Sequence, residues 1–327
     1  MLLRKVLYGI LLILLSGLKA EAQQVPLYSQ YVLNGFLINP AMAGAGGYSL
    51  VNLTAREQWI GLSDAPSTYA LSFNTRIMPS SFIKKKAPVK RKEVYGFTSG
   101  KVGLGGYIFN DRSGALGRTG MRVSYAYHLY NESNESQMSF GLSLIAYQLK
   151  FDEDRVIPRD PDDDLWISAR QSIFIPDADV GVYFSSPAYS IGFSVDQLLE
   201  SIIRFGSKSY DKYELDRNYY LFGSYDFELS NKLILAPSTL LKYNENGAFQ
   251  GDFRVKLFYD QSYWGGLTFR TGNAIIVLAG LSIDSYVFGY AYDYSMANIM
   301  RHSLGSHEFM FAVKLGEISK RYKWLKW

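Results

Sequence analysis

Three histidines, one acidic cluster and one glycine-rich stretch are the parts of this sequence whose residue types alone suggest chemistry. The histidines are His128, His302 and His307, and the chain contains no cysteine. A lipid hydrolase needs a serine and a histidine placed together, yet the stretch "RHSLGSHE" offers no defined setting for a nucleophile. We expect His128 to be a satisfied polar residue on the inner side of a strand. The sequence therefore predicts a protein that is not an enzyme and has no catalytic residue.

The acidic and glycine-rich stretches likewise favour structure over chemistry. "DPDDD" at residues 160–164 has carboxylates for calcium, but it lacks the glycine and the distal glutamate of an EF-hand loop. A solvated loop is the simpler interpretation. In "GLGGYIFND" the glycines Gly103, Gly105 and Gly106 lie inside a strand pattern rather than before a helix, so they form no phosphate loop. We expect them to permit sharp curvature or close packing of an internal segment, and we predict no cofactor and no metal.

Alternation of apolar and polar residues is the dominant pattern of the chain. In "MRVSYAYHLY" Met121, Val123 and Tyr125 fall on one face of an extended strand, and Arg122 and Ser124 fall on the other. The same pattern between turn residues predicts fourteen strands, an even number, as a closed bacterial outer-membrane barrel requires. The predicted strands are residues 48–58, 67–78, 101–110, 117–130, 137–150, 179–186, 188–195, 219–229, 232–243, 249–259, 262–270, 274–283, 285–293 and 307–315.

The composition indicates what covers the apolar face of these strands. Aromatic residues make up 16% of the chain, with 26 tyrosines, whereas charged residues make up only 20%. Transmembrane barrels carry tyrosine in girdles at both membrane interfaces. The polar faces mix serine, glycine, alanine and asparagine with scattered charges, as a narrow lumen does, and many strands have the length of a tilted membrane crossing. We therefore predict an all-β transmembrane antiparallel barrel; a soluble sandwich or propeller is the alternative.

The first residues predict export. Two basic residues precede an apolar run over residues 6–15, and Ala20 and Ala22 form an A-x-A pattern. These features are typical of a secretory signal peptide, residues 1–22, that is cleaved after Ala22. The apolar run is too short for a transmembrane anchor. Together with the barrel pattern, the signal peptide predicts localisation in the cell outer membrane.

The rest of the chain divides into a plug-like segment and the barrel. Residues 23–47 are too apolar and aromatic for a solvated tail and too irregular for a strand, so we expect them to fold into the barrel or at its mouth. Residues 48–327 would form the barrel. The connection at residues 79–100 carries "KKKAPVKRK", Lys84 to Lys92, which is either a solvated charge run or a docking segment for an acidic periplasmic partner or anionic headgroups.

The order of the strands assigns the connections to two sides of the membrane. With both termini in the periplasm, even-to-odd connections are periplasmic turns and odd-to-even connections face outward. The long connections from Asp152 to Ala178 and from Asp196 to Asn218 then lie outside. In the second of these, "DQLLESIIRF" places its leucines and isoleucines on one helical face. This pattern predicts a short amphipathic helix that caps the rim; a partner-binding helix is the alternative.

Three motifs follow one another in the first third of the chain: "YSQYVLNGFLINPAMAG", "REQWIGLSDAPSTYALSF" and "GLGGYIFNDRSG". In this order they resemble the PorP/SprF family of type IX secretion system membrane proteins from Bacteroidetes. Weaker echoes later extend the likeness over nearly the whole mature chain. Met42, where members commonly carry an aromatic residue, and the basic segment are departures from the family pattern. The motif residues that we expect to have structural or partner-binding roles are Gln30, Asn34, Asn39, Pro40, Gly44, Arg56, Gln58, Trp59, Gly61, Pro66, Asn110 and Asp111.

The resemblance implies an outer-membrane β-barrel that serves type IX secretion and, in some members, gliding motility. Members are thought to receive or retain secreted proteins through their C-terminal sorting domains and to attach adhesins at the cell surface. The implied partners are a secreted cargo protein with such a sorting domain, other type IX secretion components and outer-membrane lipid, with no nucleic acid. A transport barrel for small or hydrophobic solutes is the alternative function.

Overall fold

The computed structural model describes residues 29–77, 100–131, 133–152, 172–199, 202–204, 212–214, 216–272 and 274–315. The predicted signal peptide, the basic segment at residues 84–92 and the acidic cluster at residues 160–164 lie outside the described residues.

Alternating side chains build one large antiparallel sheet. Strands that follow one another along the chain pair in the sheet, except that β7 pairs with β10. Most of these pairs are joined by short hairpin connections. The strands of this sheet are β1 (Ser49–Glu57), β2 (Ser67–Ile77), β3 (Val102–Ser113), β4 (Leu116–Asn131), β5 (Ser136–Phe151), β6 (Ile173–Ser185), β7 (Tyr189–Asp196), β10 (Asn218–Tyr225), β11 (Phe227–Ser230), β12 (Leu233–Asn244), β13 (Phe249–Tyr259), β14 (Tyr263–Arg270), β15 (Ala274–Ile283), β16 (Tyr286–Ser295) and β17 (Ser306–Leu315).

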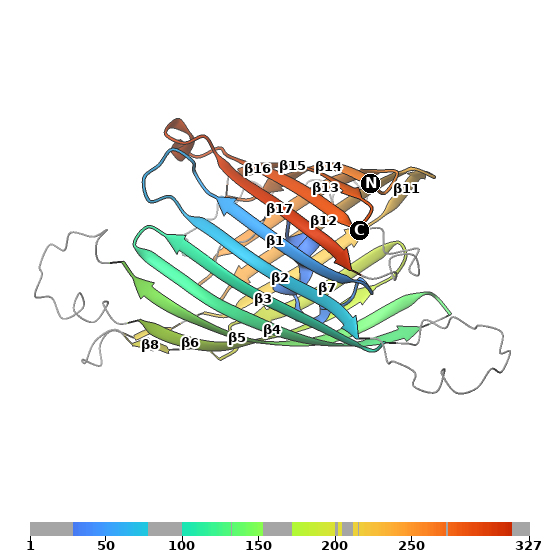
Figure 1. The fold of residues 1–327 in the computed structure, drawn as a ribbon, viewed down its shortest axis with the longest axis horizontal. Helices are drawn as coiled ribbons and strands as arrows, with labels where there is room; N and C mark the ends of the chain where they lie inside the picture. Colours follow the sequence, from blue (N-terminus) through green and yellow to red (C-terminus); the bar gives the residue numbers. More distant parts are fainter. Residues whose placement is uncertain are drawn as a thin grey trace, which may run out of the picture.

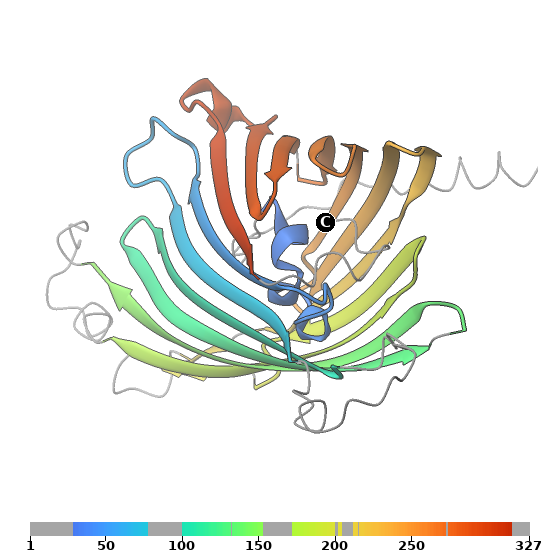
Figure 2. The ribbon, with the colours of Figure 1, turned by 45° about the vertical axis from the view of Figure 1, so that its right-hand side comes forward.

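The sheet closes into a barrel. β1 pairs with β17 from Ser49 opposite Leu315 to Glu57 opposite His307. β10 pairs with β7 on one side and β12 on the other, and β11 continues along β12 after a break at Asp226. β10 and β11 therefore form one element of the wall, which gives the fourteen predicted. Figures 1 and 2 show these strands tilted around a central lumen. Closure pairs both edges of each of the other wall strands, as a sheet in lipid requires, and β11 pairs with β12 alone.

β6 begins earlier than the alternation predicted. It starts at Ile173 rather than at residue 179, so the outer connection predicted from Asp152 to Ala178 is shorter. Pro176 lies opposite Ala146 in the ladder near the end of the barrel. The preceding Ile175 is buried against Leu149. Packing inside the barrel therefore extends the strand beyond its predicted start.

The predicted amphipathic helix in the connection between β7 and β10 is wrong. Residues Ile202–Arg204 form β8, which pairs antiparallel with β9 (Lys212–Glu214) in a separate two-stranded sheet. Adjacent isoleucines favour an extended backbone over a helix because their β-branched side chains restrict χ1.

The two ends of the barrel differ in their connections. At one end, five connections contain two to four residues each, at residues 132–135, 186–188, 231–232, 260–262 and 284–285. We call it the short-turn end; the longer connection between β2 and β3 also starts and finishes there. Asp260, Gln261 and Asp284 have positive φ, as tight hairpins demand. The opposite, long-loop end carries the longer connections at residues 58–66, 152–172, 197–217 and 296–305, together with three short turns at residues 114–115, 245–248 and 271–273.

The outward face of the wall is apolar and exposed. Val123 is 59% exposed, Leu144 62% and Leu267 58%. Exposed tyrosines lie at strand ends next to the short turns: Tyr189, Tyr225, Tyr259, Tyr263 and Tyr286. An apolar band with tyrosines at its edge is the surface that a lipid bilayer covers. The apolar faces of the strands therefore contact lipid and not a second sheet.

Candidate functional site

The lumen holds the N-terminal segment, residues 29–47, which we call the plug (Figure 2). It contains two short 3₁₀-helices, η1 (Tyr31–Leu37) and η2 (Pro40–Met42). No helix among the described residues has the length and apolarity needed to cross a membrane. The plug is the N-terminal segment that the fold prediction placed in or at the barrel mouth.

Local sequence explains the second half of the plug. The Asn39 side chain accepts a hydrogen bond from the backbone N–H of Ala41 at 2.9 Å, and Pro40 occupies the first helical position. Gly44 then takes φ of 68°, which only glycine adopts readily, and its N–H donates to Asn74 on β2 at 2.5 Å. The chain can therefore turn sharply out of η2 and into the first strand.

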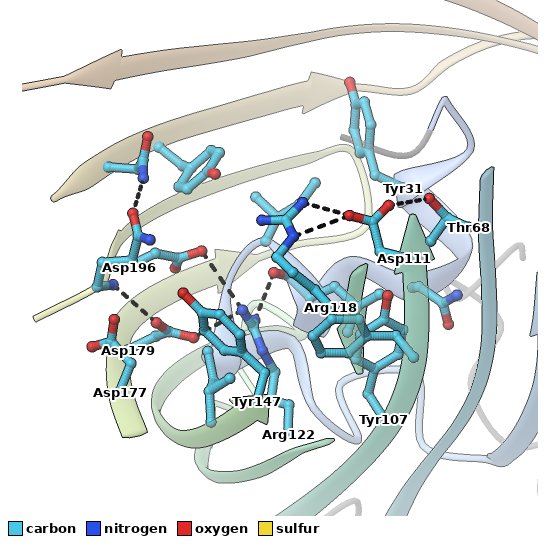
Figure 3. A pocket seen from close by; sticks show the side chains of 18 residues that line it. Tyr31, Thr68, Tyr107, Asp111, Arg118, Arg122, Tyr147, Asp177, Asp179 and Asp196 are labelled. Atoms are coloured by element: carbon cyan, nitrogen blue, oxygen red, sulfur yellow. Dashed lines mark hydrogen bonds and ion pairs between the residues drawn. The ribbon is translucent and has the colours of Figure 1, made fainter. Parts of the chain in front are cut away.

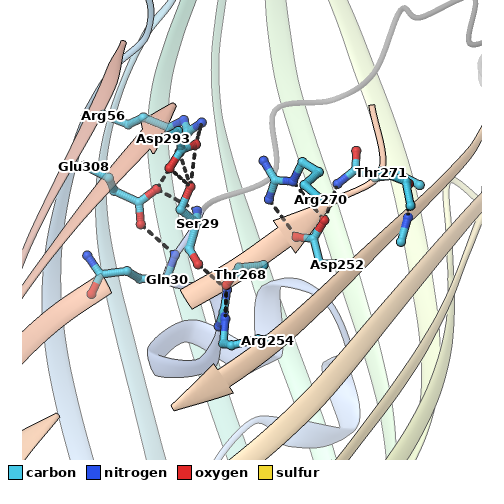
Figure 4. Close-up of polar contacts among 12 residues, drawn as sticks. Ser29, Gln30, Arg56, Asp252, Arg254, Thr268, Arg270, Thr271, Asp293 and Glu308 are labelled. Atoms are coloured by element: carbon cyan, nitrogen blue, oxygen red, sulfur yellow. Dashed lines mark hydrogen bonds and ion pairs between the residues drawn. The ribbon is translucent and has the colours of Figure 1, made fainter. Parts of the chain in front are cut away.

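Buried charges hold the start of the plug (Figure 4). The backbone N–H groups of Ser29 and Gln30 donate to the two carboxylate oxygens of Glu308 at 2.7 and 2.8 Å. The Ser29 hydroxyl donates to Asp293 at 2.8 Å and accepts from the Arg56 guanidinium at 2.6 Å. Arg56 also pairs with Asp293 at 2.6 Å and with Glu308 at 2.9 Å. These contacts join the plug to β1, β16 and β17.

A second guanidinium, that of Arg254 on β13, also contacts Ser29. Arg254 donates to the carbonyl of Ser29 at 2.5 Å and to the hydroxyl of Thr268 at 2.9 Å. Its guanidinium carbon lies 4.2 Å from the centroid of the Tyr31 ring, in cation–π geometry. We use the name Ser29 network for Ser29, Arg56, Arg254, Asp293 and Glu308.

Charge around the Ser29 network is balanced. Arg270 pairs with Asp252 at 2.7 Å beside it, so three guanidiniums face three carboxylates. Burial of unpaired charge is costly, whereas paired and hydrogen-bonded charge is tolerated. This region therefore behaves as a structural lock.

The middle of the plug bonds to the opposite wall. The Asn34 side-chain oxygen accepts from the hydroxyl of Ser72 on β2 at 2.8 Å. Arg122 on β4 donates to the carbonyl of Leu37, at the end of η1, at 2.6 Å. Arg122 thus satisfies a carbonyl that the short helix leaves without an internal partner.

Asn39 contacts the backbone of two wall strands. Its amide nitrogen donates to the carbonyl of Val182 on β6 at 2.8 Å and to that of Phe193 on β7 at 3.2 Å. The hydroxyl of Ser194 donates to the carbonyl of Ile38 at 2.6 Å. Each of these bonds uses a polar group of the plug that would otherwise be buried without a partner.

His128 is a satisfied lumen residue, as expected. It is fully buried, and its ring nitrogens lie 2.9 Å from the carbonyl of Ala43 and 2.8 Å from the hydroxyl of Ser139. Because a carbonyl only accepts, the nitrogen facing Ala43 carries the proton. The ring is thereby a further tie between wall and plug.

Glycines in the wall make room for the plug. A side chain at Gly103 would overlap the Ala43 carbonyl, and one at Gly105 would lie 2.8 Å from the Phe36 ring. Gly106, on the other face of the same strand, has nothing within 4 Å of such a position. The expected close packing of an internal segment against this strand is confirmed.

Buried apolar contacts also join the plug to the wall. Tyr31 and Ile38 of the plug form one buried cluster with Tyr220, Phe222 and Leu240 of β10 and β12. The plug therefore contacts the wall on both sides of the lumen and occupies part of the lumen.

A cavity of about 140 Å³ lies between the plug and the long-loop end (Figure 3). Plug residues from Tyr31 to Ile38 line one side of it. Asp111 accepts from the hydroxyl of Thr68 at 2.7 Å and pairs with Arg118 at 2.5 Å. The cavity also receives three carboxylates and several aromatic rings from the wall, including Asp177, Asp179, Asp196, Tyr107, Phe109, Tyr147 and Tyr220.

Four predicted site residues lie together in the β1–β2 connection at the long-loop rim. The backbone N–H of Gln58 donates to the carbonyl of Pro66 at 2.8 Å, which closes the base of the loop. Trp59 is half-buried with φ of 47°, and its N–H donates to the hydroxyl of Ser306 at 3.2 Å. Gly61 is exposed and has φ of 102°.

The last two predicted residues point in opposite directions. Asp111 faces the cavity, whereas Asn110 is exposed on the outer face and donates to Thr119 at 2.7 Å. The structure thus brings six predicted residues together in the plug and the Ser29 network, namely Gln30, Asn34, Asn39, Pro40, Gly44 and Arg56. It separates them from the rim loop and from Asn110.

Sequence reasoning missed most of the partners of these residues. Asp293, Glu308, Arg254 and Arg122 all occupy inward positions of strands with clean alternation. A full charge at an inward position was the available signal, since such a charge needs a partner in the lumen.

The fold and the plug inside the lumen define a membrane β-barrel plugged by its own N-terminal segment. A family described as "Type IX secretion system membrane protein PorP/SprF" matches residues 20–313, and the chain belongs to this family. The family is a secretion-system membrane component rather than an enzyme family, and its barrels belong to the outer membrane. None of the curated proteins searched matches the chain.

Solved structures of other barrels are similar to the chain. The BamA structure from Haemophilus ducreyi, lacking POTRA domains 1–3, has a TM-score of 0.41 and 11% identity, over 82% of this chain and 70% of that one. The TodX deltaS2S3 mutant, a monoaromatic hydrocarbon channel, has a TM-score of 0.45 and 7% identity, over 86% and 93%. A mutant of the Rh. blastica porin has a TM-score of 0.33 and 6% identity, over 82% and 99%.

Proposed function

We propose that this protein binds a secreted surface protein through the C-terminal sorting domain of that protein, and exports it or anchors it at the cell surface. It acts without catalysis, together with other type IX secretion components and outer-membrane lipid. A role in gliding motility follows if the cargo is a motility adhesin.

The plug inside the lumen, tied to the wall on both sides, is the observation that supports this proposal. The Ser29 network fixes the plug on one side of the lumen, and Arg122, Ser194 and His128 fix it on the other. A barrel plugged in this way is poorly suited to free diffusion of solutes. Its accessible surfaces are the loops and the cavity at the long-loop end, which suit the binding of another protein.

The orientation follows the same reasoning. Short turns face the periplasm in bacterial barrels, and longer loops face outward. We therefore place the short-turn end in the periplasm and the long-loop end at the cell surface, where a secreted protein is retained. The segment at residues 1–22 is proposed to be a cleaved signal peptide.

Shortening the connection between β7 and β10 tests the proposed binding surface. The design replaces residues 200–215 with a short Gly-Ser linker and keeps Leu198 and Leu199, whose N–H groups donate to Ala178 and Asp177. We expect cargo at the cell surface to fall at least about tenfold, since loops rather than wall strands carry recognition. Surface labelling of whole cells and immunoblotting measure the cargo.

A matched control shortens a short-turn connection, residues 260–262, to a two-residue Asn-Gly turn. Both variants should keep the heat-modifiable gel mobility of a folded barrel. Full cargo retention by the folded 200–215 variant would remove this connection from the binding surface.

A further inference from the structure

Three carboxylates share the cavity between the plug and the long-loop end (Figure 3). They are Asp177 and Asp179 on β6 and Asp196 on β7, and we call them the carboxylate trio. Arg122 lies 3.0 Å from Asp179 and 3.7 Å from Asp196. Asp177 instead accepts two backbone N–H groups through Oδ1, at 2.7 and 3.1 Å. Within the described part of the chain, Arg122 is the guanidinium that pairs with the trio.

Three oxygens of the trio are buried without a hydrogen bond to any described residue: Oδ2 of Asp177, Oδ2 of Asp179 and Oδ1 of Asp196. Oδ2 of Asp179 forms the ion pair with Arg122, which leaves the oxygens of Asp177 and Asp196 without a partner. Asp177 is 3% exposed and Asp196 8%, and both line the cavity. Buried acceptors are normally satisfied, because leaving one unpaired costs its full desolvation. Each of these two oxygens therefore has an acceptor position that no described donor fills.

The trio also has fewer cationic partners than the Ser29 network. Asp111 is matched by Arg118, whereas the three carboxylates of the trio lie around one guanidinium, that of Arg122. The Lys242 ammonium lies 5.8 Å from the centroid of the Tyr220 ring, which lines the cavity. In the Ser29 network and its neighbours, by contrast, three guanidiniums face three carboxylates.

The lining indicates the kind of cation. Among the described residues, no three carboxylates or histidines are arranged to hold a metal ion. Tyr107, Phe109, Tyr147 and Tyr220 line the cavity, and the Lys242 ammonium already lies over the Tyr220 ring. Aromatic rings attract guanidinium and ammonium groups. Such groups also carry the N–H donors that the two unpaired oxygens lack. We propose that this cavity binds an organic cation of the guanidinium or primary ammonium class.

The cation would enter from the long-loop end. The lining includes Asn218, the first residue of β10, and Asp196, the last residue of β7, both at that end. The Arg118 side chain is 22% exposed, so the cavity is in contact with solvent. A volume of about 140 Å³ suits the end of one side chain or one small amine. This inference goes beyond the cargo-binding proposal and does not rest on it.

Titration of the purified full-length barrel in detergent with N-acetyl-L-arginine amide tests the site. Spermidine is the free-amine probe, and N-acetyl-L-citrulline amide is the neutral analogue of the arginine probe. Asp177→Asn and Asp196→Asn remove charge while keeping an acceptor oxygen. Asp284→Asn, in a short turn at the opposite end where φ is 51°, is the matched control.

We expect the arginine amide or spermidine to bind, the citrulline amide to bind at least tenfold more weakly, and each cavity variant to weaken cation binding at least tenfold. Asp284→Asn should bind as the wild type does. Stronger binding of the arginine amide would assign the site to a basic side chain of a polypeptide, and stronger binding of spermidine to a free polyamine. No cation binding by the wild type, or cation binding by both folded cavity variants that is as tight as that of the wild type, would overturn the proposal.

Discussion

At the scale of single residues, burial decides which ion pairs hold the molecule together. Arg56 is 5% exposed at its side chain and contacts two carboxylates and Ser29. Arg217 and Glu245 form a pair at 3.4 Å, but about a third of each side chain is exposed. Water screens an exposed pair, whereas breaking a buried one leaves charge without compensation.

Replacement of Arg56 by alanine should therefore destabilise the barrel strongly. Asp293 and Glu308 would stay buried without their guanidinium, at a cost of about 3–5 kcal/mol. Thermal unfolding in detergent, followed by the loss of heat-modifiable gel mobility, measures the effect. Arg217→Ala is the matched control and should change the unfolding temperature little. Equal unfolding temperatures for the two variants would show that the Ser29 network is not a lock.

The absence of a side chain at Gly103 should be necessary for the plug to stay in place. In Gly103→Leu the new side chain would collide with the Ala43 carbonyl and with His128, whereas in Gly106→Leu it would point into open space. Hydrogen–deuterium exchange with mass spectrometry over residues 29–47 reports plug opening. We expect exchange to be faster by about tenfold or more in Gly103→Leu and unchanged in Gly106→Leu. Identical exchange in both would mean that the plug does not need this glycine.

At the scale of elements, the plug determines whether the lumen is filled or open. η1 and η2 are short 3₁₀-helices with little stability of their own, and their order comes from wall contacts. The wall, in contrast, is held by a continuous ladder from β1 around to β17. The plug is therefore the element that can be removed with the least damage to the barrel.

Deletion of residues 23–46 should convert the barrel into a pore. The lumen wall opposite the plug is rich in small and polar residues, so its removal leaves a water-filled passage. Single-channel recording in a planar bilayer should show stable conductance for the deletion variant and none for the wild type. A large, stable conductance of the wild type would instead favour the solute-transport alternative.

The sequence could predict those elements that follow from a local alternation of apolar and polar residues. Period-two alternation located all fourteen wall positions, because every wall strand has one lipid face and one lumen face. It failed at Pro176, where interior packing extends β6, and at Ile202–Arg204, where pairing with β9 replaces the predicted helix. Both errors lie near the long-loop end, where lipid no longer enforces alternation.

The site was predictable only in part, for a related reason. Asn39, Pro40 and Gly44 are visible as turn and capping residues within a few positions of one another. The partners of Arg56 are 237 and 252 positions away, and nothing local to either carboxylate indicates that Arg56 will face it. Such pairs depend on barrel closure between β1 and β17, which periodicity alone does not specify.

At the scale of the whole molecule, three surfaces have different tasks. The outer wall meets lipid, the short-turn end carries most of the tight hairpins, and the long-loop end carries the rim loops beside the cavity. A barrel with a plugged lumen and one elaborated end suits the retention of a partner better than passage. This arrangement agrees with membership of a type IX secretion family.

Copurification from the native outer membrane tests the account most directly. The tagged protein is extracted in mild detergent, and the proteins that accompany it are identified by mass spectrometry; an unrelated tagged outer-membrane barrel from the same membranes is the control. The account predicts a secreted protein with a C-terminal sorting domain, recovered with the tagged protein and not with the control. Recovery of only barrel-assembly factors and lipopolysaccharide, at good yield of the bait, would contradict it.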